Sequence, residues 1–123
     1  MTIDDPAAQR VALNFEDMRE RLGDDEELVS DVIRLFLDDY RLRLDAIGSA
    51  IEARDSGRLL AAAHTLKGGA SNLSAAGVVD AARALEAIGR SGDLTLADAR
   101  FVALVSEMEH LAAALREIQA GKS

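Results

Sequence analysis

The chain has 123 residues, a net charge of −8 and no cysteine, and it combines 49% hydrophobic with only 3% aromatic residues. The length suits one domain with one hydrophobic core, and the lack of cysteine excludes a disulfide scaffold, a thiolate zinc site and a cysteine nucleophile. The acidic balance argues against a general nucleic-acid binder and against adhesion to an anionic membrane surface. A single proline and the alanine- and leucine-rich composition favour an all-α protein.

The N-terminal residues are not expected to form a signal peptide. The acidic start, Met1 to Asp5, lacks the basic and apolar regions of a signal peptide. No apolar run approaches the roughly 18 residues that a membrane-spanning helix needs. We therefore expect a soluble, cytoplasmic protein that binds neither membranes nor nucleic acid. Met1 and the short acidic head favour a complete chain.

Apolar residues recur at helical spacing in five segments of the chain. A short helix is expected over about 6–22, followed by an acidic N-cap within 23–25. Four longer helices are expected over about 25–54, 57–73, 76–89 and 96–119, the last of them capped by Thr95. Short loops between long amphipathic helices make neighbours antiparallel. The sequence thus predicts a single domain over 1–123, built as an up-down four-helix bundle over about 25–119 with an additional N-terminal helix.

The stretch from His64 to Lys67 is followed by two glycines inside a predicted helix. Glycine costs about 1 kcal/mol relative to alanine in a helix interior, so two in succession indicate a functional constraint. On a helical wheel five apolar residues share one side, which is the expected core face: Leu59, Ala63, Leu66, Ala70 and Leu73. His64 lies about 140° from that face and should be exposed to solvent. Gly68, one turn later, leaves open space beside the ring.

A helix end at Lys67, with the glycines as its C-cap, is the alternative interpretation of this segment. Ala70 and Leu73 argue against it, because they continue the core period beyond both glycines.

The stretch from His64 to Leu73 resembles the signature of the histidine-containing phosphotransfer (HPt) family, which is His-x-Leu-Lys-Gly followed by small residues and an apolar one. Upstream, residues 25–39 are similar to the family's long first bundle helix. Downstream, Leu85-Glu86 and residues 91–94 match its usual helix end and loop. The chain departs from the family at Ser74, where a glycine is usual, which leaves the geometry of that junction open.

The resemblance implies a phosphoryl carrier in a two-component phosphorelay. His64 would accept a phosphoryl group from an aspartyl phosphate on one receiver domain and pass it to an aspartate on another. Its partners would be the receiver domains of response regulators and hybrid histidine kinases. A neutral imidazole suits this role because it is a good nucleophile near neutral pH. Phosphoryl transfer also needs in-line access and charge neutralisation, which Gly68 and Lys67 would supply.

Two residues of the following helix are further candidates. Glu86 stands where the family often has a residue that hydrogen-bonds the other ring nitrogen. By accepting from Nδ1–H it would leave Nε2 free to attack. Arg83, one turn earlier, is a weaker candidate for holding the phosphoryl group. For both residues a solvated position on the helix surface is the alternative. The second histidine, His110, is expected to be a plain surface residue.

No nucleotide-binding loop occurs in the sequence, so autokinase activity is not expected. The chain should need no cofactor, and Mg²⁺ is expected in the acidic pocket of the partner receiver domain. The two histidines lack the spacing of a metal pair, so no metal site is expected in this chain.

The predicted second helix carries a second apolar row opposite its core stripe: Leu28, Val32, Leu35 and Leu42. The first helix is expected to cover part of this row. The remainder would form an exposed surface on which a receiver domain docks, together with residues of the histidine's helix: Leu60, Ala61, Gly68 and Ser71. A closed bundle of this kind is expected to be a monomer.

Three other interpretations stay open at this point. The chain could be a helical adaptor in which His64 is incidental, or a phosphatase with His64 as a transient nucleophile. It could also be the phosphotransfer domain of a larger hybrid sensor kinase.

Overall fold

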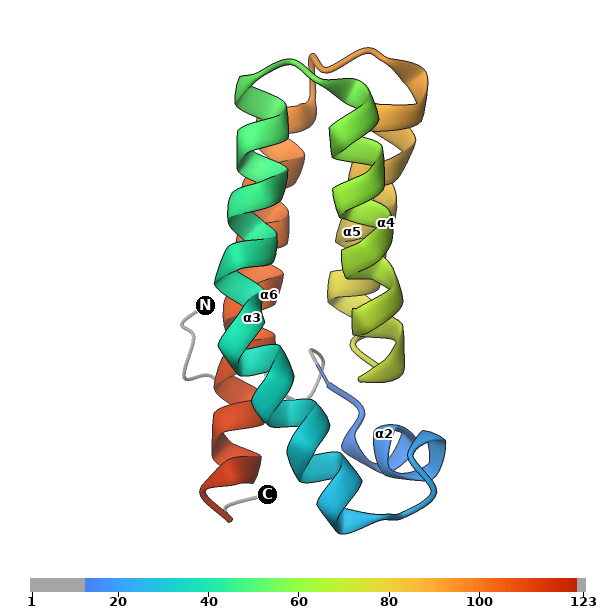
Figure 1. The fold of residues 1–123 in the computed structure, drawn as a ribbon, viewed down its shortest axis with the longest axis vertical. Coiled ribbons are helices and arrows are strands. Elements are labelled where there is room, and N and C mark those ends of the chain that lie inside the picture. The colour runs from blue at the N-terminus through green and yellow to red at the C-terminus, as the bar shows by residue number, and fades with distance from the viewer. Residues whose placement is uncertain (1–12, 122–123) are drawn as a thin grey trace.

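A computed structural model describes residues 13–121 and shows an all-helical bundle within them. The helices are α2 (Phe15–Arg21), α3 (Glu26–Glu52), α4 (Ser56–Asn72), α5 (Ala76–Ser91) and α6 (Ala97–Gln119). Consecutive long helices run in opposite directions, and α6 closes the bundle by packing against both α3 and α5 (Figure 1). Short α2 lies at the open end of the bundle, beside the first turns of α3. The predicted antiparallel four-helix bundle is confirmed.

Side-chain caps define where three of the helices begin. Asn14, Asp25 and Asp55 have extended backbones, and each side chain accepts a hydrogen bond of 3.0–3.1 Å from the backbone N–H three residues later. The predicted acidic N-cap before the longest helix is therefore confirmed as Asp25. Because Asn14 caps α2, the helix begins at Phe15. Residues 13–14, which were predicted to be helical, therefore lie outside it. Residues 6–12 of that prediction lie outside the described part of the chain.

The predicted end of α5 at Gly89 and the predicted cap of α6 at Thr95 are both wrong. The helix continues through Gly89 to Ser91 and ends at Gly92, whose φ of 78° is the left-handed conformation typical of a helix C-cap. Thr95 does not cap α6, because it lies one residue before the cap position, and its hydroxyl donates a hydrogen bond of 2.6 Å to Asp93. The cap position of α6 is Leu96, which has no side-chain oxygen to offer.

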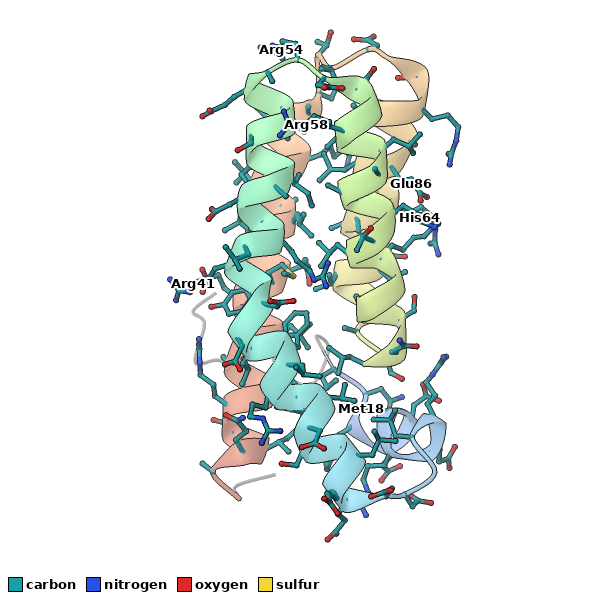
Figure 2. All side chains as sticks on the ribbon, viewed as in Figure 1. Met18, Arg41, Arg54, Arg58, His64 and Glu86 are labelled. Atoms are coloured by element: carbon teal, nitrogen blue, oxygen red, sulfur yellow. The ribbon has the colours of Figure 1, made fainter. Side chains whose placement is uncertain are left out.

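The core face predicted for the histidine's helix is confirmed, since all five of its apolar residues are buried in the structure. Helix α4 also continues through both glycines to Asn72, which excludes a C-cap at Lys67. Met18 of α2 is fully buried at the lower end of the bundle (Figure 2). Residues 13–121 contain no helix that is both long and apolar enough to cross a membrane.

Ser74, where the resembled family usually has a glycine, lies at the junction between α4 and α5. Its φ of 55° lies in the left-handed region, which costs a non-glycine residue about 1 kcal/mol and makes glycine the usual choice. The Ser74 hydroxyl donates a hydrogen bond to the carboxylate of Asp17, and its carbonyl accepts from the N–H of Asn14 at 3.3 Å. Ser74 thus adopts the left-handed conformation of the turn, and its two hydrogen bonds connect the start of α2 to the α4–α5 junction.

Candidate functional site

His64 projects from the outer side of α4, and 71% of its side-chain surface is exposed (Figure 2). The predicted exposure of the ring is confirmed. A Cβ atom built on Gly68, one turn later, would have no neighbouring atom within 4 Å. Another molecule can therefore approach the ring from the side of Gly68.

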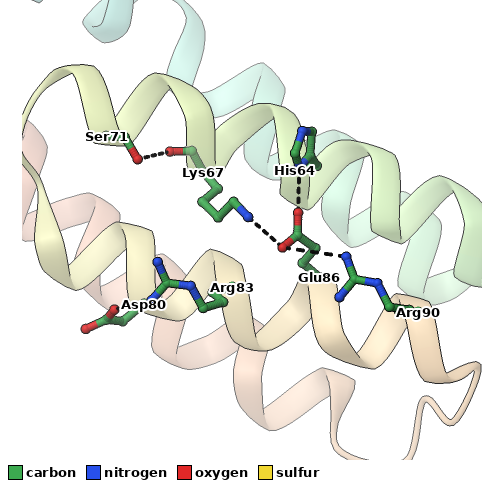
Figure 3. Close-up of polar contacts among 7 residues, drawn as sticks. All are labelled: His64, Lys67, Ser71, Asp80, Arg83, Glu86 and Arg90. Carbon is green, nitrogen blue, oxygen red and sulfur yellow. Dashed lines mark hydrogen bonds and ion pairs between the residues drawn. The ribbon is translucent and has the colours of Figure 1, made fainter.

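Glu86 on α5 is buried, with only 4% of its surface exposed, so the interpretation of this residue as a solvated surface glutamate is wrong. Its two carboxylate oxygens have separate partners (Figure 3). The Nδ1–H of His64 donates to Oε2 at 2.6 Å, and Nζ of Lys67 donates to Oε1 at 2.7 Å. These contacts compensate for removing a carboxylate from water.

The same two hydrogen bonds keep Glu86 ionised. The bond from Lys67 is the larger cause and the bond from His64 the second, and against the effect of burial they lower the pKa of Glu86 to about 2. An ionised carboxylate can only accept hydrogen bonds, so the proton of a neutral His64 ring must sit on Nδ1. The lone pair is then on Nε2, at the exposed edge of the ring.

The sequence places Lys67 one turn from His64 as a source of positive charge, and the structure shows that this charge is paired with a residue of the next helix. The side chain of Lys67 is half-buried and its ammonium group is bound to Glu86 on α5. The backbone carbonyl of Lys67 accepts a hydrogen bond of 2.9 Å from Ser71. Lys67 therefore both positions the buried carboxylate and places a positive charge near His64.

A second cation near Glu86 was not anticipated. Nη2 of Arg90 lies 4.0 Å from Glu86 Oε1, and its side chain is mostly exposed. The signal for it was present, because residues four apart on a helix lie on the same face. Arg83 instead pairs with Asp80 at 3.1 Å, and neither a hydrogen bond nor an ion pair joins it to Glu86 (Figure 3).

His110, the other histidine, is half-buried on α6 rather than plainly exposed as the sequence suggested.

The second apolar row of α3 is largely uncovered. Leu28, Leu35 and Leu42 are exposed, whereas Val32 is partly buried against the core. The described part of the N-terminal helix therefore leaves the three leucines of this row exposed, as expected for the remainder of the row. Exposed leucines on one helix face are candidates for contact with another protein.

The structure brings together only some of the predicted docking residues. Leu42 and Ala61 line one shallow groove between α3 and α4, which also includes Thr65. Leu60 is half-buried on the side of α4 that faces α5. Ser71 lines a separate hollow near the start of α2. The exposed surface of α3 and the groove beside it are therefore the best-defined candidates for a docking surface.

Comparisons with known proteins agree with this geometry. The family model of the Hpt domain matches residues 31–120, a range that contains every residue of the site around Glu86. Among solved structures, the chain is similar to the crystal structure of histidine-containing phosphotransfer protein B (HptB) from Pseudomonas aeruginosa PAO1. The TM-score is 0.84 at 24% sequence identity, over 89% of this chain and 96% of that chain. No curated protein matches the chain.

Proposed function

Since the chain belongs to the Hpt domain family of histidine phosphotransfer proteins, which act in phosphorelays, we propose that His64 is the residue that carries the phosphoryl group. One observation supports this assignment above the others. His64 is an exposed imidazole whose Nδ1–H is held by a buried, ionised carboxylate, so that the nucleophilic nitrogen faces solvent.

In the proposed reaction, Nε2 of His64 attacks the phosphorus of an aspartyl phosphate on a receiver domain. The new N–P bond forms as the P–O bond breaks, and the electron pair of that bond leaves with the receiver's carboxylate. The ring gains positive charge during this step because Nδ1 keeps its proton. The carboxylate of Glu86, 2.6 Å away, is already in place to stabilise that charge. Transfer onward to a second receiver is the reverse of this step.

Cations near the ring complete the proposed site. Lys67 holds Glu86 in position, and the mostly exposed Arg90 adds positive charge 4.0 Å from the same carboxylate oxygen. Both charges favour the approach of an anionic phosphoryl group. Glu86 is already bound by these groups, so we place the Mg²⁺ of the reaction in the receiver's acidic pocket. We further propose that the chain acts as a monomer and has no autokinase activity.

The proposal is tested by incubating the chain with an aspartyl-phosphorylated receiver domain and Mg²⁺. We expect an acid-labile, base-stable phosphate on the wild type and on His110→Gln, and none on His64→Gln. If neither the wild type nor His64→Gln is labelled, the chain is an adaptor. Rapid release of free phosphate would indicate a phosphatase, and labelling by ATP alone would indicate a kinase.

A further inference from the structure

Gly89 is buried inside α5, at the point where this helix lies closest to α4. A Cβ atom built on Gly89 would lie 2.7 Å from the backbone nitrogen of Leu60 and 2.9 Å from its Cα. It would also lie 2.9 Å from the backbone oxygen of Ser56. Real Cβ atoms essentially never approach other atoms so closely. The atoms in the way belong to the backbone of α4, so no side-chain rotation can make room.

This backbone contact lies one turn away from the candidate site. Leu60 precedes His64 by four residues on α4, and Gly89 follows Glu86 by three residues on α5. The two helices run antiparallel, so the Leu60–Gly89 pair and the His64–Glu86 pair lie across the same interface. The separation of the helices at Gly89 is therefore nearly the separation across which Glu86 reaches His64 and Lys67.

We propose that Gly89 is a positioning residue for phosphoryl transfer. By letting the backbones of α4 and α5 touch, it places the carboxylate of Glu86 within hydrogen-bond distance of His64 Nδ1 and Lys67 Nζ. This inference rests on the proposed role of His64. It goes beyond that role because Gly89 touches none of the reacting groups.

The distances show why one methyl group matters here. An ordinary van der Waals contact of a Cβ atom is 3.4–4 Å, so a side chain at Gly89 requires α4 and α5 to separate locally by about 1 Å. N–H···O hydrogen bonds have donor–acceptor distances up to about 3.2 Å, and a separation of about 3.6 Å is no longer a hydrogen bond. A displacement of that size would lengthen the contacts of 2.6 and 2.7 Å at Glu86 beyond this limit.

Gly77 provides a matched control on the same helix. The three atoms nearest to a Cβ atom at Gly77 all belong to the carboxylate of Glu107, the far end of a flexible side chain that can move aside. Gly89→Ala and Gly77→Ala are therefore the same chemical change in α5. Only the first pushes on the backbone of α4.

The first test needs no phosphoryl donor. In the wild type and in Gly77→Ala, ¹⁵N NMR of the neutral His64 ring should show one tautomer with the proton on Nδ1. In Gly89→Ala we expect a mixture of tautomers, and a pKa of Glu86 raised from about 2 toward its ordinary value. An unchanged tautomer and an unchanged Glu86 titration in Gly89→Ala would overturn the inference.

The second test measures transfer from a phosphorylated receiver domain in a double-mutant cycle. We expect Gly89→Ala to slow transfer roughly tenfold, because misplacement of about 1 Å disrupts catalytic geometry. In a Glu86→Ala background the same substitution should have no further effect, because Gly89 acts through Glu86. An equal loss of transfer rate in both backgrounds would show that Gly89 does not act through Glu86. If Gly89→Ala instead fails to unfold cooperatively, Gly89 is needed for the stability of the bundle rather than for the site.

The two tests separate this inference from the proposed function. If the wild type accepts no phosphate but its tautomer depends on Gly89, the proposed function fails, while the positioning of Glu86 and His64 by Gly89 stands. If the wild type is labelled and Gly89→Ala behaves like it in both tests, only the role of Gly89 fails.

Discussion

Lys67 on α4 donates a hydrogen bond of 2.7 Å to Glu86 on α5, and this bond is the largest cause of the low pKa of the carboxyl. The lysine therefore acts on His64 in two ways, as a nearby positive charge and through the carboxylate that orients the ring. These two contributions can be separated, because only the second changes the titration of Glu86.

We predict that Lys67→Met raises the pKa of Glu86 from about 2 toward its ordinary 4.5 and slows phosphoryl transfer roughly tenfold. Methionine keeps the apolar part of the half-buried side chain, so the change removes the charge with little loss of packing. The measurements are ¹³C NMR titration of the carboxyl and the transfer rate. Arg83→Ala is the control, because this exposed cation contacts Asp80 rather than Glu86. A Glu86 titration that Lys67→Met leaves unchanged would contradict the assignment.

The depressed pKa of Glu86 also predicts how stability depends on pH. In the unfolded chain this carboxyl titrates near 4.5, and in the folded protein near 2. Between these values the unfolded state binds more protons, so the stabilisation by Glu86 is fully present above about pH 4.5 and is lost as the pH falls toward 2.

Urea unfolding of the wild type and of Glu86→Gln measures this contribution. The difference in the free energy of unfolding between the two proteins should shrink steadily as the pH is lowered from about 5 to about 3. Asp17 and Asp93, whose pKa values are also lowered by hydrogen bonds, are common to both proteins and cancel in the difference. A difference that does not vary with pH would mean that Glu86 is not held as an ionised group.

The orientation of α4 was predictable from the sequence because it depends on one helix alone. The core period through Leu59 to Leu73 places His64 on the opposite side whatever the neighbouring helices do. Capping by Asp25 was predictable for the same reason, since the cap contacts only the first turn of its own helix. Glu86 could be connected to His64 only through the family resemblance, because the pairing crosses two helices.

Other features depend on contacts that no local pattern contains. Gly89 resembles a helix end in the sequence, and its packing function arises from the backbone of α4 nearly thirty residues earlier. Whether Lys67 reaches solvent or Glu86 is decided by the separation of α4 and α5. At Thr95, the hydroxyl donates to Asp93, and the cap position of α6 falls one residue later, at Leu96.

Gly68 and Gly69 allow stability and access to be tested separately. A Cβ atom at either position meets open space, so Gly68→Ala and Gly69→Ala should each stabilise the protein by about 1 kcal/mol through helix propensity. Gly68 lies one turn from His64 on the same face, whereas Gly69 is turned well away from it. We therefore expect Gly68→Leu to slow transfer strongly and Gly69→Leu to leave it near the wild-type rate. Chemical denaturation and transfer assays measure both effects, and equal transfer rates for the two leucine variants would show that access to His64 does not pass over Gly68.

The exposed row of α3 leads to the last prediction, which concerns docking. Leu35 and Leu42 are 65% and 67% exposed, and Leu42 lies in the groove beside Ala61. Leu35→Glu and Leu42→Glu should slow transfer about tenfold, the effect of losing roughly 1–2 kcal/mol of docking free energy. Their unfolding free energies should stay close to that of the wild type, because neither side chain belongs to the core.

Val102 on α6 is the matched control for these two residues, since its exposure of 69% is nearly the same. Val102→Glu should leave both transfer and stability unchanged if the receiver docks on α3 and α4. Leu60→Glu should lower both the transfer rate and the free energy of unfolding, because Leu60 is half-buried beside Gly89. Transfer rates that fall for Val102→Glu as much as for Leu42→Glu would place the docking surface elsewhere, or show that added negative charge alone weakens receiver binding.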